Sequence, residues 1–512
     1  MTPGGFASGL ATLVKNSGRA SLWLALVLAL GLGGVLSLSL APLHILWTLP
    51  LALGGIGVLA LRAVGWRQAA LIGWAFGLGY FGFGLSWIIE PFQIDAERYA
   101  WMAPFALVFL AGGLALFWGA TFALAARWAV GQRRLLVLLV FWSLAEFGRA
   151  YLLTGFPWAG FGQFWIDTPM AQLLPWIGAQ GLAFLTLAVC LPLALLRRKP
   201  VLALSPLVVT TAMVLLLPAP PAAEMTTRLV RLVQPNAPQA EKWLPKKRWE
   251  FARRAVELSA KGQGTTAPQP ELIVWPETAV PQLLNHADET LAAIMAQIGG
   301  VPLLVGIQRE EDGRFFNSAA LVDQAGVAVQ IYDKAHLVPF GEYVPFGDTM
   351  ARFGIYGFAS QAGAGYSAGA GPQVMDLPIG TALPLICYEA VFAQDVNAVK
   401  QRPEMLIQIT NDAWFGARSG PYQHLVQAQM RAAEQGLPML RAANTGITAM
   451  IDPYGQIREN IPLGEAGAVD ALLPKPLAAT LYSRTGDWPV FLLCIALGLF
   501  FWFRGAAVAR HS

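Results

Sequence analysis

The sequence predicts a membrane α-helical bundle of eight spans joined to one large α/β domain outside the membrane. Hydrophobic residues make up 55% of the 512 residues and charged residues only 13%, a balance too apolar for an ordinary soluble protein. The apolar excess fills two regions, 21–218 and 488–503, and the stretch between them has globular composition. We therefore expect seven transmembrane helices in 1–221, an extramembrane domain in 222–485, and a last transmembrane helix with a tail in 486–512.

Eight apolar runs reach roughly the 20 residues that a helix needs to cross the hydrocarbon core. The fifth run contains Glu146 and Arg149, which lie three residues apart on one helix face and are expected to pair inside the bundle. An alternative for the first run is a signal peptide, because Lys15 and Arg19 precede it and it ends in small residues near Ser37 and Ser39. The runs are 21–40, 44–61, 68–89, 104–126, 135–153, 171–196, 201–217 and 488–503.

The connections between these runs differ in positive charge. Lys and Arg favour cytoplasmic loops, and here one alternate set of connections carries nearly all of them, while the other set holds only Arg98 and Arg149. This asymmetry predicts that both termini are cytoplasmic and that the large domain lies in a periplasm-like space. The positive set is Lys15, Arg19, Arg62, Arg67, Arg127, Arg133, Arg134, Arg197, Arg198, Lys199, Arg504 and Arg510.

Within the large domain, short β-rich runs alternate with helical patterns, which is typical of a layered α/β fold. Strands are predicted at 229–234, 272–275, 303–307, 319–322, 327–332, 383–387, 406–410 and 448–451, and helices at 249–258, 290–298, 391–399 and 422–434. Polar clusters end three of the strands, at 275–277, 387–389 and 410–412. Because ligands bind beyond the carboxyl ends of strands in such sheets, we expect these clusters to meet in one pocket.

Cys387 is the single cysteine of the large domain, since Cys190 and Cys494 fall in apolar runs. A lone cysteine at a strand end is most often a small core residue. However, a free thiol facing an oxidising compartment is a liability, which favours a functional role. A nucleophilic cysteine needs a base and a nearby cation, and Glu277 and Lys334 are the candidates.

Glu277, Lys334 and Cys387 stand in the chain order of the Glu-Lys-Cys triad of the nitrilase superfamily, which this sequence resembles. The resemblance implies a nitrilase-like α-β-β-α sandwich. It also implies that Glu277 is the general base, that Lys334 stabilises the tetrahedral intermediate, and that Cys387 is acylated. Glu342 matches a second glutamate that often lies beside the triad.

With its spans, the whole chain resembles a membrane branch of that superfamily, the apolipoprotein N-acyltransferase family. The motifs that carry this resemblance lie at 275–278, 338–345, 386–389 and 411–416. The residues assigned to supporting or substrate-binding roles are Glu342, Glu389, Tyr388, Trp243, Asn317 and Trp414.

The family resemblance implies two-step acyl transfer in the inner membrane of a bacterium, with the catalytic domain in the periplasm. Cys387 would take the sn-1 acyl chain of a phospholipid, with phosphatidylethanolamine the expected donor, as a thioester. The α-amine of the diacylglyceryl-modified N-terminal cysteine of a lipoprotein would then take the chain as an amide. No cofactor is needed, and we expect a monomer. Residues 346–371 predict either a mobile lid against the bilayer or a surface loop that packs its own aromatic side chains.

Two other functions fit parts of the sequence. A membrane-tethered nitrilase or amidase acting on a small C–N substrate would carry the same triad and use water as the second acceptor. A transporter with an accessory domain fits the spans, but the sequence has no internal repeat. His336 and His424 are interpreted as structural, the five histidines form no metal-binding pattern, and the net charge of +4 forms no patch for nucleic acid.

Overall fold

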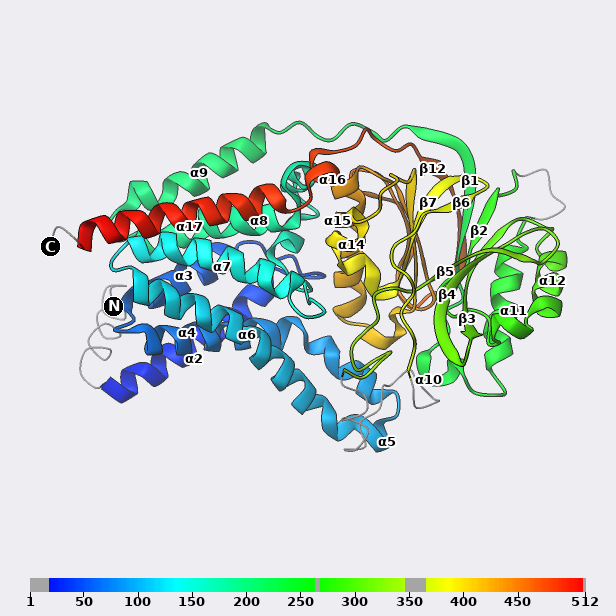
Figure 1. The fold of residues 1–512 in the computed structure, drawn as a ribbon, viewed down its shortest axis with the longest axis horizontal. Coiled ribbons are helices and arrows are strands. Elements are labelled where there is room, and N and C mark those ends of the chain that lie inside the picture. The colour runs from blue at the N-terminus through cyan, green and yellow to red at the C-terminus, as the bar shows by residue number, and fades with distance from the viewer. Residues whose placement is uncertain (1–17, 263–267, 346–364, 510–512) are drawn as a thin grey trace, which may run out of the picture.

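The computed structural model describes residues 18–262, 268–345 and 365–509, and its two halves differ in architecture (Figure 1). One half is a bundle of helices, and the other consists of two β-sheets covered by helices. The chain leaves the bundle after α9 and returns to it in α17, which lies against α7. Most of the predicted lid, with Phe346, Phe353, Ile355, Tyr356, Phe358 and Gly363, lies outside the described residues.

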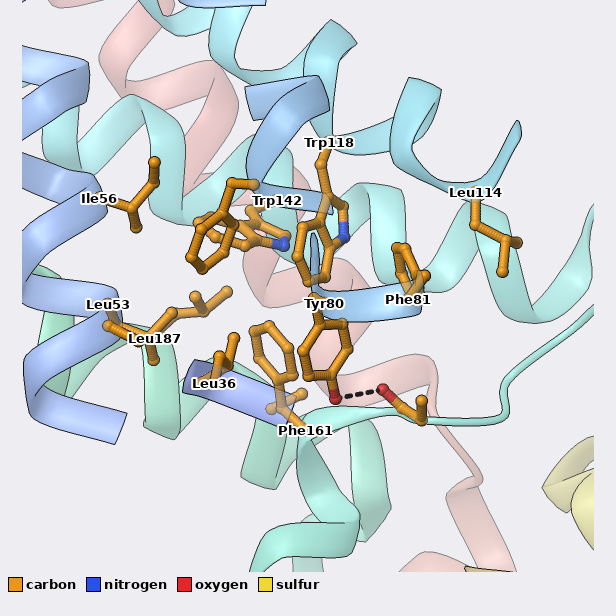
Figure 2. Packing of buried hydrophobic residues seen from close by; sticks show 14 of the residues in the cluster. Leu36, Leu53, Ile56, Tyr80, Phe81, Leu114, Trp118, Trp142, Phe161 and Leu187 are labelled. Atoms are coloured by element: carbon orange, nitrogen blue, oxygen red, sulfur yellow. Dashed lines mark hydrogen bonds between the residues drawn. The ribbon is translucent and has the colours of Figure 1, made fainter. Parts of the chain in front are cut away.

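Long apolar helices make up the bundle, and buried aromatic side chains fill its centre (Figure 2). Trp118 stacks on Tyr80 with ring centroids 5.2 Å apart and meets Trp142 edge-on at 4.9 Å. The phenol of Tyr80 donates a hydrogen bond to the carbonyl of Ala159 at 2.8 Å. The main helices are α2 Gly18–Ser37, α3 Thr48–Arg62, α4 Trp66–Gly84, α6 Ala103–Trp128, α7 Arg133–Tyr151, α8 Leu174–Cys190, α9 Pro200–Leu216 and α17 Trp488–Ala509.

Two helical stretches of the described chain, Ala96–Trp128 and Pro169–Leu195, are long and apolar enough to cross a membrane. A third is added if Trp66–Gly84 and Ser86–Gln93, bent by 47°, count as one span. Four shorter apolar helices coincide with predicted runs: Ser21–Ser37, Thr48–Arg62, Pro200–Leu216 and Trp488–Phe501. The helical character of the region is therefore clear, while the count of eight spans stays a prediction. Glu146 and Arg149 pair inside the bundle as expected, at 2.6 Å.

The other half is an α-β-β-α sandwich of two six-stranded sheets. The first sheet has the order β12-β1-β2-β3-β4-β5 and the second β11-β10-β9-β8-β7-β6. Their strands are β1 Met225–Gln234, β2 Leu272–Val274, β3 Leu303–Glu311, β4 Arg314–Val322, β5 Ala328–Asp333, β6 Met375–Leu377, β7 Gly380–Ile386, β8 Met405–Thr410, β9 Met439–Ala443, β10 Thr448–Ile451, β11 Ile457–Ile461 and β12 Gly467–Pro474.

Alternation along the strands builds the layers of the sandwich, because successive side chains of a strand point to opposite faces. In β2, Leu272 and Val274 pack between the two sheets, whereas Ile273 packs under the outer helices α11 (Arg248–Ser259) and α12 (Asp288–Gln297). The second sheet is covered by α14 (Ala393–Asn397) and α15 (Gly420–Gln435). Helix α15 lies between this sheet and the helical bundle (Figure 1), so it joins the two halves.

All eight predicted strands are present, seven with shifted ends and β10 with the predicted bounds, and β6, β9, β11 and β12 are not among the predicted strands. Strand β11 has four exposed residues out of five, so its charged sequence lacks the apolar alternation of a half-buried strand. The helix predicted at 391–399 is shorter, because residues Cys387–Val391 form the 3-10 helix η7 before α14 begins.

Candidate active site

The three predicted catalytic residues lie at the ends of strands in both sheets. Glu277 follows β2 and Lys334 follows β5 in the first sheet, and Cys387 follows β7 in the second. All three side chains are buried. Because the two sheets pack face to face, Glu277 and Lys334 of the first sheet lie near Cys387 of the second, although the three are far apart in the sequence.

Lys334 is held between two carboxylates. Its Nζ lies 2.8 Å from Glu342 Oε2 and 3.9 Å from Glu277 Oε1. The amide of Asn317 donates to Glu277 Oε1 at 2.7 Å and to Glu342 Oε1 at 3.1 Å. Burial opposes the charge of Lys334, but the neighbouring acidic groups, Glu342 first, outweigh it and raise the pKa of Lys334 above its usual value. The site therefore favours the charged form of Lys334 beside Glu277.

Cys387 is the first residue of η7, at the strained turn that directly follows β7. Its φ of 54° lies in the left-handed region, which non-glycine residues adopt at a cost of about 1–3 kcal/mol and which is enriched at functional sites. Burial and the charge of Glu277 raise the pKa of the Cys387 thiol, and Lys334 opposes them. The resting group is therefore a thiol, and its reaction as a nucleophile requires a base.

The backbone carbonyl of Cys387 is bound by a buried polar network. Gln408 Nε2 donates to it at 3.0 Å, and His424 Nε2 lies 3.0 Å from it. His424 Nδ1 lies 2.8 Å from Asp412 Oδ1, and Arg441 pairs with the other oxygen of Asp412. Although burial opposes it, Arg441 holds the pKa of Asp412 below its usual value. His424 thus contacts the backbone of Cys387, in keeping with the structural role predicted for it.

Glu389 connects the segment after Lys334 to the turn that carries Cys387. Its carboxylate accepts hydrogen bonds from the Tyr332 hydroxyl at 2.8 Å and from the backbone N–H groups of Ala335 at 2.7 Å, His336 at 3.1 Å and Ile386 at 2.7 Å. Tyr388 packs edge-on against Phe392, with ring centroids 4.8 Å apart. Both residues are buried, and Glu389 fixes the relative position of the lysine and cysteine segments.

The two predicted tryptophans lie apart from the triad in the described contacts. Trp243 follows the short helix α10 (Gln239–Lys242) and lines a small pocket with Phe251, Pro281 and Asn444. Trp414 belongs to the 3-10 helix η8 (Asp412–Phe415) and is partly exposed. Their assignment to substrate binding stays a prediction.

Sequence reasoning missed a buried lysine behind Glu277. Lys242 Nζ donates to the backbone carbonyl of Glu277 at 3.1 Å and lies 2.8 Å from Thr278 Oγ1. Burial lowers the pKa of Lys242 to about 8, although Glu277 opposes the shift. Its position next to Trp243 was the available signal, but a lysine at a helix end normally lies in solvent.

Tyr366 and the network residues Gln408, Asp412 and Arg441 were also not predicted as site residues. The hydroxyl of Tyr366 accepts a hydrogen bond from Gln308, and its backbone N–H donates to Glu342 O at 2.8 Å. Only Asp412 had a signal, because it belongs to the motif at 411–416. Within the described residues, no group of three His, Cys, Asp or Glu side chains is arranged to hold a metal ion.

Known proteins match both halves of this architecture. The family model for carbon-nitrogen hydrolases matches residues 229–480, and the model for the apolipoprotein N-acyltransferase N-terminal domain matches residues 32–191. A protein of Rhodopseudomonas palustris named apolipoprotein N-acyltransferase is 38% identical, over 92% of this chain and 93% of its own length. The chain belongs to the apolipoprotein N-acyltransferase family.

A second relative with the name apolipoprotein N-acyltransferase, from Bradyrhizobium diazoefficiens, is 37% identical over 96% of each chain. Among solved structures, a CN-hydrolase superfamily protein from Xanthomonas campestris covers 52% of this chain and 97% of its own, with 20% identity and a TM-score of 0.35. In this member of the N-acyltransferase family, the match at 32–191 lies within the helical bundle, and the match at 229–480 covers nearly all of the sandwich.

Proposed function

We propose that this protein is a membrane-bound bacterial acyltransferase that moves the sn-1 acyl chain of a phospholipid to the N-terminal amine of a lipoprotein. Family membership supports the N-acylation of apolipoproteins. The observation that supports the chemistry is that Glu277, Lys334 and Cys387 are all buried and follow strands β2, β5 and β7 of the two sheets, with Lys334 Nζ 3.9 Å from Glu277 Oε1. The fused apolar bundle suits substrates that are themselves anchored in lipid.

In the first step, Cys387 Sγ attacks the ester carbonyl carbon and its proton passes to Glu277. A base is required because burial keeps the thiol protonated. The oxyanion that forms is stabilised by the ammonium of Lys334, which Glu342 holds in its charged form. The C–O bond then breaks, the departing alkoxide takes the proton from Glu277, and the lysophospholipid leaves. The acyl chain remains on Cys387 as a thioester.

In the second step, the α-amine of the diacylglyceryl-cysteine attacks the thioester carbonyl carbon. Glu277 accepts a proton from the amine, and Lys334 again faces the oxyanion. The C–S bond breaks, the thiolate recovers the proton from Glu277, and the product is an amide. The group that attacks the thioester therefore separates the two reactions. An amine gives the amide product of an acyltransferase, whereas water would give the free acid, as in a hydrolase of the same fold. We propose phosphatidylethanolamine as the donor.

The supporting residues act through the triad in this proposal. Asn317 and Glu342 align Glu277 and Lys334 by the hydrogen bonds described above, and Glu389 braces the turn of Cys387. Tyr388, Trp243 and Trp414 are assigned to substrate binding. Of these, Trp243 has the clearest support, because it lines a pocket beside Thr278.

For the membrane arrangement we propose eight spans and a catalytic domain that faces the periplasm from the inner membrane. The domains are 1–221, 222–485 and 486–512, the protein is a monomer, and both termini are cytoplasmic. The apolar helices of the bundle and the charge asymmetry of the loops support this arrangement. A reporter enzyme that works only in the periplasm should be active when it is fused after Leu217. If instead only a reporter that works in the cytoplasm is active there, the proposed orientation is wrong.

One experiment tests the proposed reaction. Purified full-length protein is incubated with phosphatidylethanolamine vesicles, and the peptide that contains Cys387 is analysed by mass spectrometry. A fatty-acyl adduct should appear on Cys387 and should be discharged by a diacylglyceryl peptide with formation of an amide. Cys387→Ala should form no adduct. Absence of the adduct in the wild type would contradict the proposal, and discharge to free fatty acid with no amide would favour the amidase-like alternative.

A further inference from the structure

Gln423 of helix α15 is a buried side chain of the sandwich whose hydrogen bonds all go to the helical bundle. Only 1% of its surface is exposed. Its Oε1 accepts from Trp87 Nε1 at 3.2 Å and Trp158 Nε1 at 2.8 Å, and its Nε2 donates to the carbonyls of Gly84 at 3.1 Å and Ala41 at 3.4 Å. These four contacts use both lone pairs and both N–H groups of the amide. These four partners form a polar socket around the Gln423 amide, and they come from three segments of the bundle, at residue 41, at residues 84–87 and at residue 158.

The next residue of α15, His424, faces the other half of the molecule. Adjacent residues of an α-helix are about 100° apart around its axis, so the two side chains leave α15 in different directions. His424 is fully buried and lies 3.0 Å from the carbonyl oxygen of Cys387. One helix turn therefore connects the bundle socket to the backbone of the candidate nucleophile.

Trp158 contacts both of these side chains. Besides donating to Gln423, its ring stacks on the imidazole of His424, with centroids 5.5 Å apart and planes at 25°. Phe415 packs against the rings of Trp87, Trp158 and His424 at 4.9–5.5 Å. Interiors packed in this way transmit displacements, so a shift of the socket would move the imidazole.

The Cys387 turn is the element that depends on this support. A non-glycine residue keeps a left-handed backbone conformation only where its surroundings fix it. The carbonyl of Cys387 accepts a hydrogen bond from Gln408 Nε2, and the imidazole of His424 lies against it with Nε2 at 3.0 Å. Release of the carbonyl would let the peptide rotate and would carry Sγ away from Lys334 and Glu277.

We propose that Gln423 is a positioning residue, through which the helical bundle sets the geometry of Cys387 by way of Trp158 and His424. The bundle then has a role in the reaction besides anchoring the sandwich to lipid. The part of this inference that concerns acyl transfer rests on the proposed function. If Gln423 merely fastened the two halves, its loss would lower stability and leave the reactivity of Cys387 unchanged in the folded protein.

The test compares Gln423→Met with Gln429→Met in the full-length protein. Gln429 is a matched control because it is a buried glutamine of the same helix whose amide donates within the sandwich, to Gly455 O at 2.9 Å. We expect Gln423→Met to slow single-turnover acylation of Cys387 about tenfold, the effect of one or two buried hydrogen bonds. The phospholipid concentration for half-maximal rate should stay within about twofold of wild type, and Gln429→Met should retain the wild-type rate. Equal slowing in both variants, or a wild-type rate in folded Gln423→Met, would overturn the inference.

Alkylation of Cys387 by iodoacetamide gives a second measurement that does not need acyl transfer. Gln423→Met should react about fivefold more slowly than wild type, because Sγ moves away from the base and the cation, and Gln429→Met should react like wild type. If the wild type forms no acyl adduct, the proposed function is wrong. The alkylation rates of the wild type and the two variants still test whether Gln423 positions Cys387. Equal alkylation rates for wild type and Gln423→Met would refute it.

Milder variants keep the test decisive if Gln423→Met does not fold. Trp158→Phe and Trp87→Phe each remove one indole donor and retain an aromatic ring. Both should slow acylation and alkylation by about two- to fivefold. Trp158→Phe should show the larger effect, because Trp158 also stacks on His424. Unchanged rates in both variants would reject the role of the socket.

Discussion

The Lys334 ammonium lies 2.8 Å from the carboxylate of Glu342, closer than the 3.9 Å that separates it from Glu277. The lysine therefore has a primary counter-ion that is not the proposed base. This arrangement leaves the Glu277 carboxylate available for proton transfer, while Asn317 keeps it near the lysine. Lys334 can act as the cation and Glu277 as the base in the same site because the closest ion pair of Lys334 is with Glu342.

Glu342→Gln should therefore impair the reaction more than the fold. Without its closest counter-ion, Lys334 is expected to move toward Glu277 and to hold it in an ion pair. We expect the rate of Cys387 acylation to fall by about 10²-fold or more, the range typical of lost acid–base catalysis. Single-turnover mass spectrometry measures the rate, and the melting temperature serves as the control for folding. Wild-type acylation by Glu342→Gln would show that Glu277 is not protected in this way.

Lys242 predicts a specific pH dependence of stability. Its pKa in the folded protein is lowered to about 8 from a usual 10.5, so between these values the unfolded chain binds more protons than the folded protein. Stability must then rise with pH across this window, by about 1 kcal/mol per unit at most. Below pH 8 the full penalty for burying the charged lysine is present.

Comparison of wild type with Lys242→Met isolates this contribution. Denaturation between pH 7.5 and 10 should show that the stability difference between the two proteins changes in favour of wild type as the pH rises. Lys475→Met is the control, because Lys475 is exposed and pairs with Glu224 at 3.0 Å. A stability difference independent of pH would mean that Lys242 keeps its proton throughout the window.

Gly306 is expected to be essential for the placement of Glu277. A Cβ atom at Gly306 would lie 2.4 Å from the carbonyl oxygen of Pro276 and 2.5 Å from the Cα of Glu277. Backbone atoms must shift to accommodate it, which typically costs about 1–3 kcal/mol. We expect Gly306→Ala to reduce Cys387 acylation by about 10–100-fold, since a small misplacement of a catalytic group has effects of this size.

The control for Gly306→Ala is Gly467→Ala, in strand β12. There the added Cβ would meet only the side chain of Ile461, at 3.5 Å, which is ordinary contact. Gly467→Ala should keep the wild-type acylation rate. Equal rates in the two variants would show that the backbone at Glu277 adjusts without loss of geometry.

The sequence predicted the layered fold and candidate residues of the site because both depend on local patterns. Strands such as β10 are short apolar runs that can be found in the sequence, and Glu277 and Cys387 belong to polar clusters at strand ends. Asn317 and Glu342 were both predicted as supporting residues. The structure places Asn317 against Glu277 and Glu342, and Glu342 against Lys334.

The site features that were not predicted depend on contacts between segments that are distant in the sequence. Gln423 contacts Trp87 across 336 positions, and nothing in its own neighbourhood in the sequence distinguishes it from Gln427 or Gln429. Lys242 has the sequence context of an exposed helix end, and its burial depends on how α10 packs behind Glu277. Gly306 lies in an apolar run, and the sequence around it does not indicate that the backbone of residues 276–278 packs directly against it.

The buried pair of Arg149 and Glu146 predicts how the bundle fails when one partner is removed. Arg149 Nη2 donates to Glu146 Oε2 at 2.6 Å, and Arg149 Nη1 donates to the carbonyls of Phe156, in a short contact, and of Trp158, at 2.7 Å. Among the residues that the structure describes, Arg149→Met would leave the buried carboxylate of Glu146 with Trp118 as its remaining partner, at 2.7 Å. Such an unpaired buried charge typically costs about 3–5 kcal/mol.

The double variant Glu146→Gln/Arg149→Met should recover part of this loss, because it removes the uncompensated charge while the amide can still accept from Trp118. Thermal unfolding in detergent measures both variants, with tryptophan fluorescence as the probe of the bundle. Arg149 also fixes the segment with Trp158, which contacts Gln423, so the double variant should remain slow in acylation even where its stability returns. Recovery of both properties together would mean that Arg149 acts on stability alone, and that the segment finds its place against Gln423 without it.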